Sequence, residues 1–135
     1  MNKYLYKIAV IAIAYLISCG GAVGQTVTKL STDQYNFVEG PTWDGKDNVY
    51  FTDVNGNAII KYSTSKKTFK TLVSNTKKAN GMMFNTDNTL VVCEGEAGNL
   101  GVRDTNGIIL RTLATAYNTI RFNSPNDLCI DGKGG

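Results

Sequence analysis

Three polar residues with oxygen-bearing side chains recur at matching points of this sequence. Glu39, Asn80 and Asn126 each open a short run that carries a large apolar side chain and then a turn rich in Asp, Asn, Gly and Lys. They lie 41 and then 46 positions apart. Carboxylate and amide oxygens suit hard cations such as calcium, which takes roughly six to eight oxygen ligands. These residues could therefore hold a metal ion if the fold brings them together.

The absence of histidine narrows the chemistry. None of the 135 residues is histidine. This excludes a Ser-His-Asp triad, a histidine general base and the histidine-rich ligand sets of catalytic zinc sites. Any reaction carried out by these residues must use carboxylates, amides, hydroxyls or an oxygen-bound metal ion.

A second acidic position shows that the pattern is an internal repeat. Asp53 follows Glu39 by 14 positions, and Glu94 follows Asn80 by the same number. A shared offset at two places indicates a repeat of about 40–45 residues. The third unit begins at Asn126, and the given sequence stops before the corresponding acid would occur.

Each unit is predicted to form four short β-strands. Residues 48–54 alternate, with Val49 and Phe51 on one face and Tyr50 and Thr52 on the other, as in a half-buried strand. The other predicted strands are 40–44, 58–63 and 68–74 in the first unit, and 81–85, 89–95, 99–105 and 108–115 in the second. Helical periodicity is weak after Gly24, with a short turn of helix within 112–120 as an alternative.

Four strands per repeat of this length predict an all-β fold, a β-propeller in which each unit is one blade. Residues 25–135 would form about two blades plus the start of a third, which is too few to close a ring. We therefore expect a partial propeller domain, truncated at its C-terminus and inactive by itself. In a propeller the first strand of each blade lines the central channel, so the three repeated polar residues would meet at one mouth of it. The alternative is that they only hydrogen-bond loop amides between blades.

Three segments resemble a known family. "FVEGPTWD", "NGMMFNTDNTLVVCE" and "RFNSPNDLCIDGKGG" are similar to the gluconolactonase and senescence-marker-protein (regucalcin-like) family of six-bladed propellers, from Phe37 to the last residue. The resemblance implies one axial divalent metal, usually calcium, with Glu39 as a ligand and Asn126 as a ligand or substrate contact. It makes Asn80 a candidate for lining the substrate pocket.

The same resemblance implies that part of the metal site and the acid/base residue are not among these 135 residues. The remaining metal ligands and the aspartate with the acid/base role come from later blades in this family, beyond Gly135. Arg121 is a candidate contact for a sugar oxygen or carboxylate near Asn126, and the alternative is that it pairs with a surface acid.

The activity implied by the resemblance is metal-dependent hydrolysis of a small sugar lactone, an aldonolactone, to the aldonic acid. The same pocket could equally hydrolyse phosphotriesters or other esters. A different class of function is also open, because a fold alone does not fix a function. In that alternative the protein is a non-catalytic, lipid-anchored propeller that binds a protein or a glycan.

Residues 1–24 are predicted to be a signal peptide. Two lysines precede an apolar run of ten residues, 8–17, which is too short to span a bilayer, since that needs about 20 residues. "LIS" before Cys19 is similar to a bacterial lipobox, so Cys19 is the expected lipidation site. The alternatives are ordinary cleavage ahead of Gln25 and an uncleaved anchor. All three predict export, as a periplasmic or outer-membrane lipoprotein or as a secreted protein.

Charge and cysteines add two further expectations. The formal net charge is +3 and the lysines are scattered, so no nucleic-acid partner is expected, and the membrane is contacted only through a lipid anchor. Cys93 and Cys129 lie in apolar patterns without Cys-x-x-Cys spacing, and both are expected to be free and buried. An exported compartment would also permit a disulfide between them.

Overall fold

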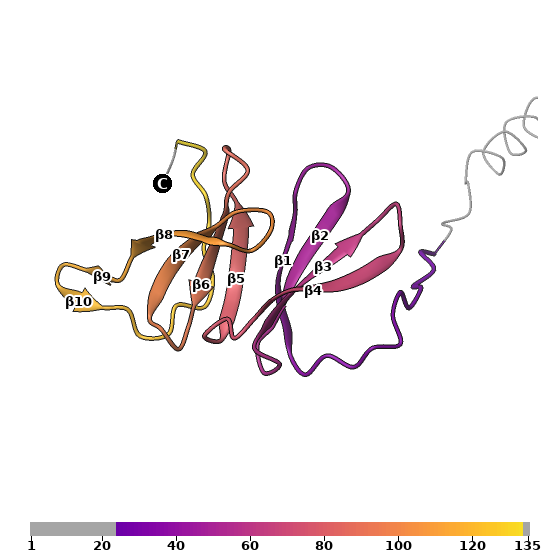
Figure 1. Ribbon diagram of the computed structural model, residues 1–135, viewed down its shortest axis with the longest axis horizontal. Helices are drawn as coiled ribbons and strands as arrows, with labels where there is room; N and C mark the ends of the chain where they lie inside the picture. Colours follow the sequence, from indigo (N-terminus) through magenta and orange to yellow (C-terminus); the bar gives the residue numbers. More distant parts are fainter. Residues whose placement is uncertain (1–23, 134–135) are drawn as a thin grey trace, which may run out of the picture.

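The computed structural model describes residues 24–133, which form two four-stranded antiparallel sheets and a small hairpin (Figure 1). The first sheet contains β1 (Val38–Trp43), β2 (Asn48–Asp53), β3 (Ala58–Ser63) and β4 (Thr68–Ser74). The second contains β5 (Ala79–Phe84), β6 (Leu90–Glu94), β7 (Asn99–Arg103) and β8 (Ile109–Ala114). The hairpin pairs β9 (Ala116–Tyr117) with β10 (Ile120–Arg121). Strands of each large sheet neighbour one another in sequence order, as in a propeller blade.

The strands agree with the sequence-based prediction. Each of β1 to β8 overlaps a predicted strand, with ends that differ by at most two residues. The helical alternative for 112–120 is wrong, because this stretch completes β8 and enters the β9–β10 hairpin. Residues 24–133 contain no α-helix, and so no helix there is long and apolar enough to cross a membrane.

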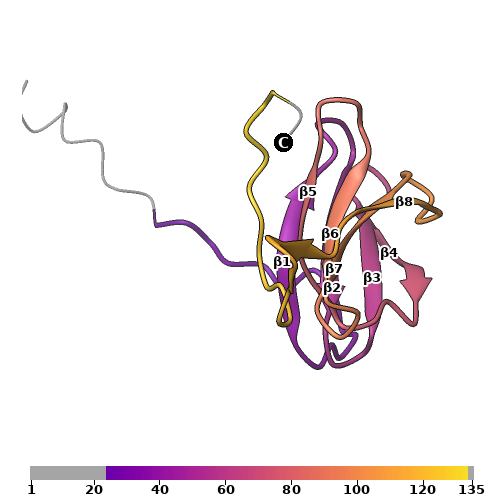
Figure 2. The same cartoon turned by 90° about the vertical axis from the view of Figure 1, so that its left-hand side faces the viewer.

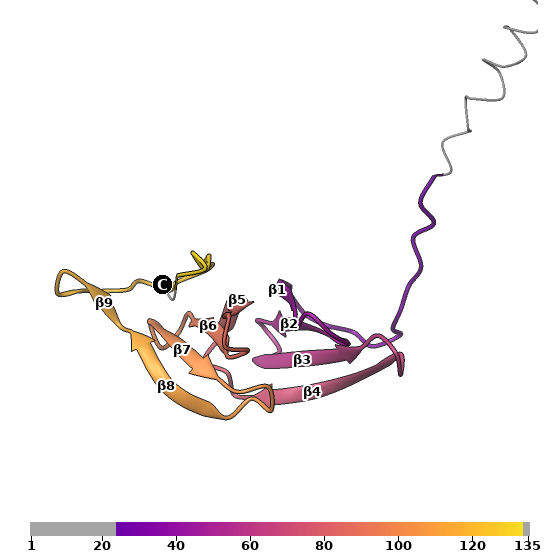
Figure 3. The same cartoon turned by 90° about the horizontal axis from the view of Figure 1, so that it is seen from above.

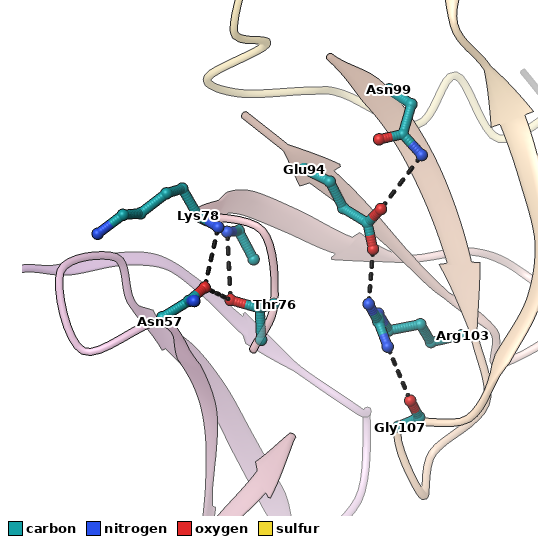
Figure 4. Close-up of polar contacts among 8 residues, drawn as sticks. Asn57, Thr76, Lys78, Glu94, Asn99, Arg103 and Gly107 are labelled. Atoms are coloured by element: carbon teal, nitrogen blue, oxygen red, sulfur yellow. Dashed lines mark hydrogen bonds and ion pairs between the residues drawn. The ribbon is translucent and has the colours of Figure 1, made fainter. Parts of the chain in front are cut away.

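Turn chemistry explains where the strands end. Asn57 and Asn88 lie in the β2–β3 and β5–β6 turns with φ of 56° and 63°, a left-handed backbone that asparagine tolerates. The side-chain oxygen of Asn57 also accepts hydrogen bonds from the Thr76 hydroxyl at 3.1 Å and the Lys78 amide at 3.0 Å (Figure 4). This turn therefore fixes the connection from the first blade to the second.

The main core lies between the two blades. Tyr50 and Phe84, one from each sheet, meet edge to face with ring centroids 5.0 Å apart. Tyr50 and Thr52 are fully buried and Val49 and Phe51 only partly, as the alternation predicted. Seen from above, β1 and β5 lie side by side at the inner edge of the arc, and β4 and β8 lie at its outer edge (Figure 3). The segment after β10 returns to the inner edge beside β5 (Figures 1 and 2).

One cysteine prediction is correct and the other is wrong. Cys93 and Cys129 are both free, and Cys93 is fully buried in β6, where burial, followed by the charge of Asp127, raises its pKa to about 11. Cys129, in contrast, is exposed. It has the repeat position of Met83, which points outward from β5, and no strand pairs with residues 126–131 in the described part of the chain.

Thiol labelling tests this difference. We expect a maleimide to modify Cys129 rapidly at neutral pH and to leave Cys93 unmodified until urea unfolds the protein, because the reactive species is the exposed thiolate. Mass spectrometry of tryptic peptides measures each cysteine separately. Folded-state rates within about tenfold of each other would contradict the assigned burial.

Candidate functional site

The first two repeated polar residues lie at the same point of neighbouring inner strands. Glu39 is the second residue of β1 and Asn80 is the second residue of β5, and these strands lie side by side (Figure 3). Asn126 lies in the segment beside β5, where its carbonyl oxygen accepts a 2.6 Å hydrogen bond from the Gly81 amide. The three backbones are therefore neighbours in the order of the repeat.

A glycine after each of the first two residues permits this close approach. A Cβ atom on Gly40 would lie 2.6 Å from the Asn80 carbonyl oxygen and 2.8 Å from the Gly81 Cα. A Cβ atom on Gly81 would lie 2.7 Å from both the Asn126 carbonyl oxygen and the Asp127 Cα. All these distances are below 3.0 Å, which real Cβ contacts essentially never reach. Glycine is thus required at both of these close approaches.

Each inner strand is also irregular at this glycine. The register of β1 against β2 shifts between Glu39 and Thr42, and that of β5 against β6 shifts between Ala79 and Met82. A β-bulge bends the strand and re-aims the neighbouring side chain. Because of this bulge, the side chains of Glu39 and Asn80 do not have to follow the alternation of the packed residues after them.

Thr52 links the starts of the two inner strands. It is fully buried, and its hydroxyl oxygen lies 3.1 Å from the carbonyl oxygens of both Glu39 and Asn80, which share its single proton. Sequence reasoning gave Thr52 no such role, although a polar side chain beside Tyr50 on a buried face was the available signal. Cys93 occupies the equivalent position in the second blade.

The carboxylate and amide oxygens of these three residues are the ligand types that a hard cation prefers. Glu39 and Asn80 are half-buried and Asn126 is exposed. The Asn80 Oδ1 atom is buried, with no hydrogen-bond partner in the described part of the chain, and such a desolvated oxygen is costly unless something binds it. These three donors would supply roughly half of a calcium shell. Residues 24–133 contain no group of three or more Cys, Asp or Glu side chains that could hold a metal.

The repeated acids stabilise the fold instead of joining this site. Asp53 is buried at the end of β2 and accepts hydrogen bonds from the backbone amides of Asn36, Phe37 and Gly56. Burial raises the pKa of Asp53, but these amide bonds together hold it below its usual value. The ionised carboxylate therefore clamps the segment that leads into β1.

Glu94 has the same repeat position and a different set of partners. It forms a buried 2.6 Å ion pair with Arg103 and accepts a 3.1 Å hydrogen bond from Asn99 (Figure 4). Arg103 also donates to the Gly107 carbonyl at 3.0 Å. The turn at Gly107 packs so closely on Val73 of the first blade that a Cβ there would collide with it. This network therefore holds the second blade against the first.

Arg121 lies in β10 and contacts the β6–β7 turn. Its guanidinium donates a 2.6 Å hydrogen bond to the Ala97 carbonyl. Within residues 24–133 it has no ion pair with an acid, so the predicted alternative is not observed there. Arg121 lines a pocket of about 410 Å³ with Glu96 and Ser124.

Glu39 lines a different pocket. This pocket has a volume of about 350 Å³ and is bounded by apolar groups of Tyr35, Pro41 and Phe51, on the side of β2 opposite to Tyr50. The structure therefore places Glu39 and Arg121 beside separate pockets, while the backbones of Glu39, Asn80 and Asn126 form one row.

The predicted lipidation site, Cys19, lies outside the described residues, as does the predicted signal peptide except Gly24. Lipidation and export therefore stay predictions.

The chain has clear similarity to known proteins. Residues 37–135 match the family model described as the SMP-30/gluconolactonase/LRE-like region. No curated protein matches the chain significantly. A solved gluconolactonase from Xanthomonas campestris is similar with a TM-score of 0.70 and 28% identity, over 76% of this chain and 34% of that one.

Two further solved structures show the fold alone, because their identity is low. A protein provisionally identified as a gluconolactonase gives a TM-score of 0.74 at 24% identity, over 83% of this chain and 38% of that one. A luciferin-regenerating enzyme gives a TM-score of 0.54 at 14% identity, over 73% of this chain and 34% of that one. The chain thus spans little more than a third of the length of these structures. The likeness confirms the predicted propeller, of which the two sheets are blades.

Proposed function

Because the chain belongs to the SMP-30/gluconolactonase/LRE-like family, we propose that it contributes two blades and the start of a third to a metal-dependent lactone hydrolase. The proposed reaction adds water to a small sugar lactone, an aldonolactone, and breaks the ring ester bond to give the aldonic acid. The similarity to the X. campestris gluconolactonase supports this reaction class. The activity is proposed for the protein as a whole, since the chain spans about a third of that structure.

One observation carries the proposal. The starts of β1 and β5 and the segment at Asn126 are held side by side by the contacts of Gly40 and Gly81, and each bears an oxygen donor: Glu39, Asn80 or Asn126. Such a row at the mouth of a propeller channel offers one charged and two neutral oxygens to a single cation.

The cation and these residues would divide the work. A bound divalent cation, most readily calcium, would polarise the lactone carbonyl and stabilise the oxyanion formed by attack of water. Glu39 would supply negative charge to the cation, and Asn80 and Asn126 would supply amide oxygens to the cation or to sugar hydroxyls. Thr52 would keep the backbones of Glu39 and Asn80 in register.

The general base is proposed to come from another blade. Asp53 and Glu94, the acids repeated in this chain, are engaged by backbone amides and by Arg103, so neither is free to activate water. The family resemblance gives this role to an aspartate beyond Gly135. Arg121, beside its own pocket, is proposed to bind the hydroxyl-bearing end of the substrate.

The proposed setting is outside the cytoplasm. The sequence pattern of residues 1–24 supports export, with Cys19 as the lipidated residue or with simple secretion as the other outcome. A small sugar lactone is the proposed partner, and nucleic acid is not.

Two changes to the complete protein test this function: removal of the metal by a chelator, and substitution of Glu39. We expect a chelator to abolish lactone opening, measured as acid release at constant pH, and added calcium to restore it. Glu39→Gln should raise the calcium concentration needed for half-maximal activity about tenfold or more, because one ligand charge is lost.

Asp87→Asn is the matched control, because it removes the same charge at the far end of β5, where Asp87 bonds Thr89. It should leave the calcium dependence unchanged. Full activity without metal, or an unaltered response in Glu39→Gln, would refute the metal mechanism. Calcium binding without lactone hydrolysis would favour the non-catalytic binding module.

A further inference from the structure

A second polar pocket is lined by residues of both blades but by none of the inner strands β1 and β5. It has a volume of about 240 Å³ and lies between the β3–β4 hairpin of the first blade and the β7–β8 turn of the second. Three lysines line it, Lys61, Lys66 and Lys70, together with Asp47 and Asn106. Pockets for drug-sized ligands usually measure roughly 300–1,000 Å³, so this one suits a small ion or group.

The charges in this pocket are not balanced. Asp47 is the single acid lining it, and its carboxylate already accepts hydrogen bonds from Ser63 at 2.7 Å, Thr64 at 2.8 Å and the Ser65 amide at 2.8 Å. None of the three lysines forms an ion pair within residues 24–133. The lining therefore carries an excess of two positive charges.

The strand register brings two of these positive charges close together. Lys61 and Lys70 are directly opposite each other in the β3–β4 pair. Like charges at directly opposed positions destabilise a sheet. A lysine on an edge strand such as β4 can also protect against aggregation, but Lys61 lies one strand further in, so that role does not account for it.

Packing holds parts of the pocket in place. The Lys61 ammonium group lies 5.4 Å from the centre of the Tyr50 ring, which is fully buried. The opposite wall includes Asn106. Its turn is fixed by two hydrogen bonds, one from the Asn106 amide to the Asp104 carboxylate and one from the Arg103 guanidinium to the Gly107 carbonyl. The cationic hairpin thus faces a preformed wall supplied by the other blade.

We propose that this pocket binds an oxyanion of the phosphate or sulfate class. Lysine is a common point-charge binder of phosphate, and a doubly charged anion would neutralise the excess charge and relieve the Lys61–Lys70 repulsion. A free phosphate group and a lipid phosphate share this chemistry. The site is separate from the proposed lactone site and does not depend on it.

Calorimetric titration of the complete protein with inorganic phosphate at low ionic strength tests the proposal. We expect saturable binding that weakens at least about tenfold in Lys61→Gln/Lys70→Gln. The control Lys29→Gln/Lys133→Gln removes the same charge from exposed residues outside this pocket, and it should change affinity less than about twofold. Equal weakening in both variants would overturn the site.

A second variant gives a readout in the opposite direction. Lys70→Glu should raise the thermal midpoint in phosphate-free buffer by about 2–4 °C, since it creates an opposite-charge pair with Lys61, and it should abolish phosphate binding. A stabilised variant that still binds phosphate would overturn the proposal.

Vesicles distinguish the source of the phosphate. Binding to phosphatidylglycerol vesicles but not phosphatidylcholine vesicles, lost in Lys61→Gln/Lys70→Gln, would identify a lipid headgroup. Binding of free phosphate without vesicle binding would identify a soluble ligand. Failure to bind either form would overturn the proposal.

Discussion

Replacement of Arg103 by methionine is expected to lower the free energy of unfolding by about 3–5 kcal/mol, because it leaves the Glu94 carboxylate buried without its cation. The pair is formed at 2.6 Å, with side chains only 6% and 8% exposed. Domains of this kind are usually stable by about 5–15 kcal/mol, so the loss would be a large fraction of the total. Urea unfolding followed by far-ultraviolet circular dichroism measures it.

The double variant Glu94→Leu/Arg103→Met provides the control. Replacing both charges with apolar groups removes the uncompensated charge, so the double variant should recover at least half of the loss seen in Arg103→Met. The single variant Glu94→Leu completes the comparison. If the stability lost in the double variant equals the sum of the losses in Glu94→Leu and Arg103→Met, the ion pair is not the source of the effect. The hydrogen bond from Arg103 to Gly107 would then be the dominant contact.

The substitution Gly40→Ala should cost about 2–5 kcal/mol. Part of the cost is backbone strain, because Gly40 has φ of 51° and a left-handed conformation costs other residues about 1–2 kcal/mol. The rest is steric, because the new Cβ would meet the backbone of Asn80 and Gly81, and backbone cannot move aside as a side chain can. In the complete protein we also expect lactone hydrolysis to fall, since β1 and β5 would separate at the proposed site.

Gly45→Ala separates the two contributions. Gly45 also has a positive φ, of 75°, but a Cβ there would meet nothing within 4 Å. It should therefore show the strain without the collision, and unfold at higher urea concentration than Gly40→Ala. Equal losses in the two variants would show that the close contact between the inner strands is absent.

The strands and the repeat could be predicted because they depend on local rules. Alternation around Tyr50, asparagine in the turns at Asn57 and Asn88, and the shared offset of Asp53 and Glu94 all act over a few residues or one period. Such patterns survive in any fold that buries one face of each strand. These local patterns were therefore enough to predict the two four-stranded blades.

The uses of individual side chains could not be predicted in this way. The offset that links Asp53 with Glu94 did not reveal that one binds backbone amides and the other Arg103. Cys129 was predicted to be buried from its apolar neighbours, although its exposure depends on which strands pack beside it. Partners distant in the sequence decide these outcomes.

The chain's residue order is enough to establish four strands per repeat, a polar residue at the start of each repeat, and membership of a propeller fold, because hydrophobic period and turn residues act locally. Packing between blades alone decides that Gly40 and Gly81 contact the next repeat, that Thr52 joins two strand starts, and that Asn106 of the second blade lines one pocket with Lys61 of the first. These are contacts between residues far apart in the chain, and their geometry exists only once the sheets are docked.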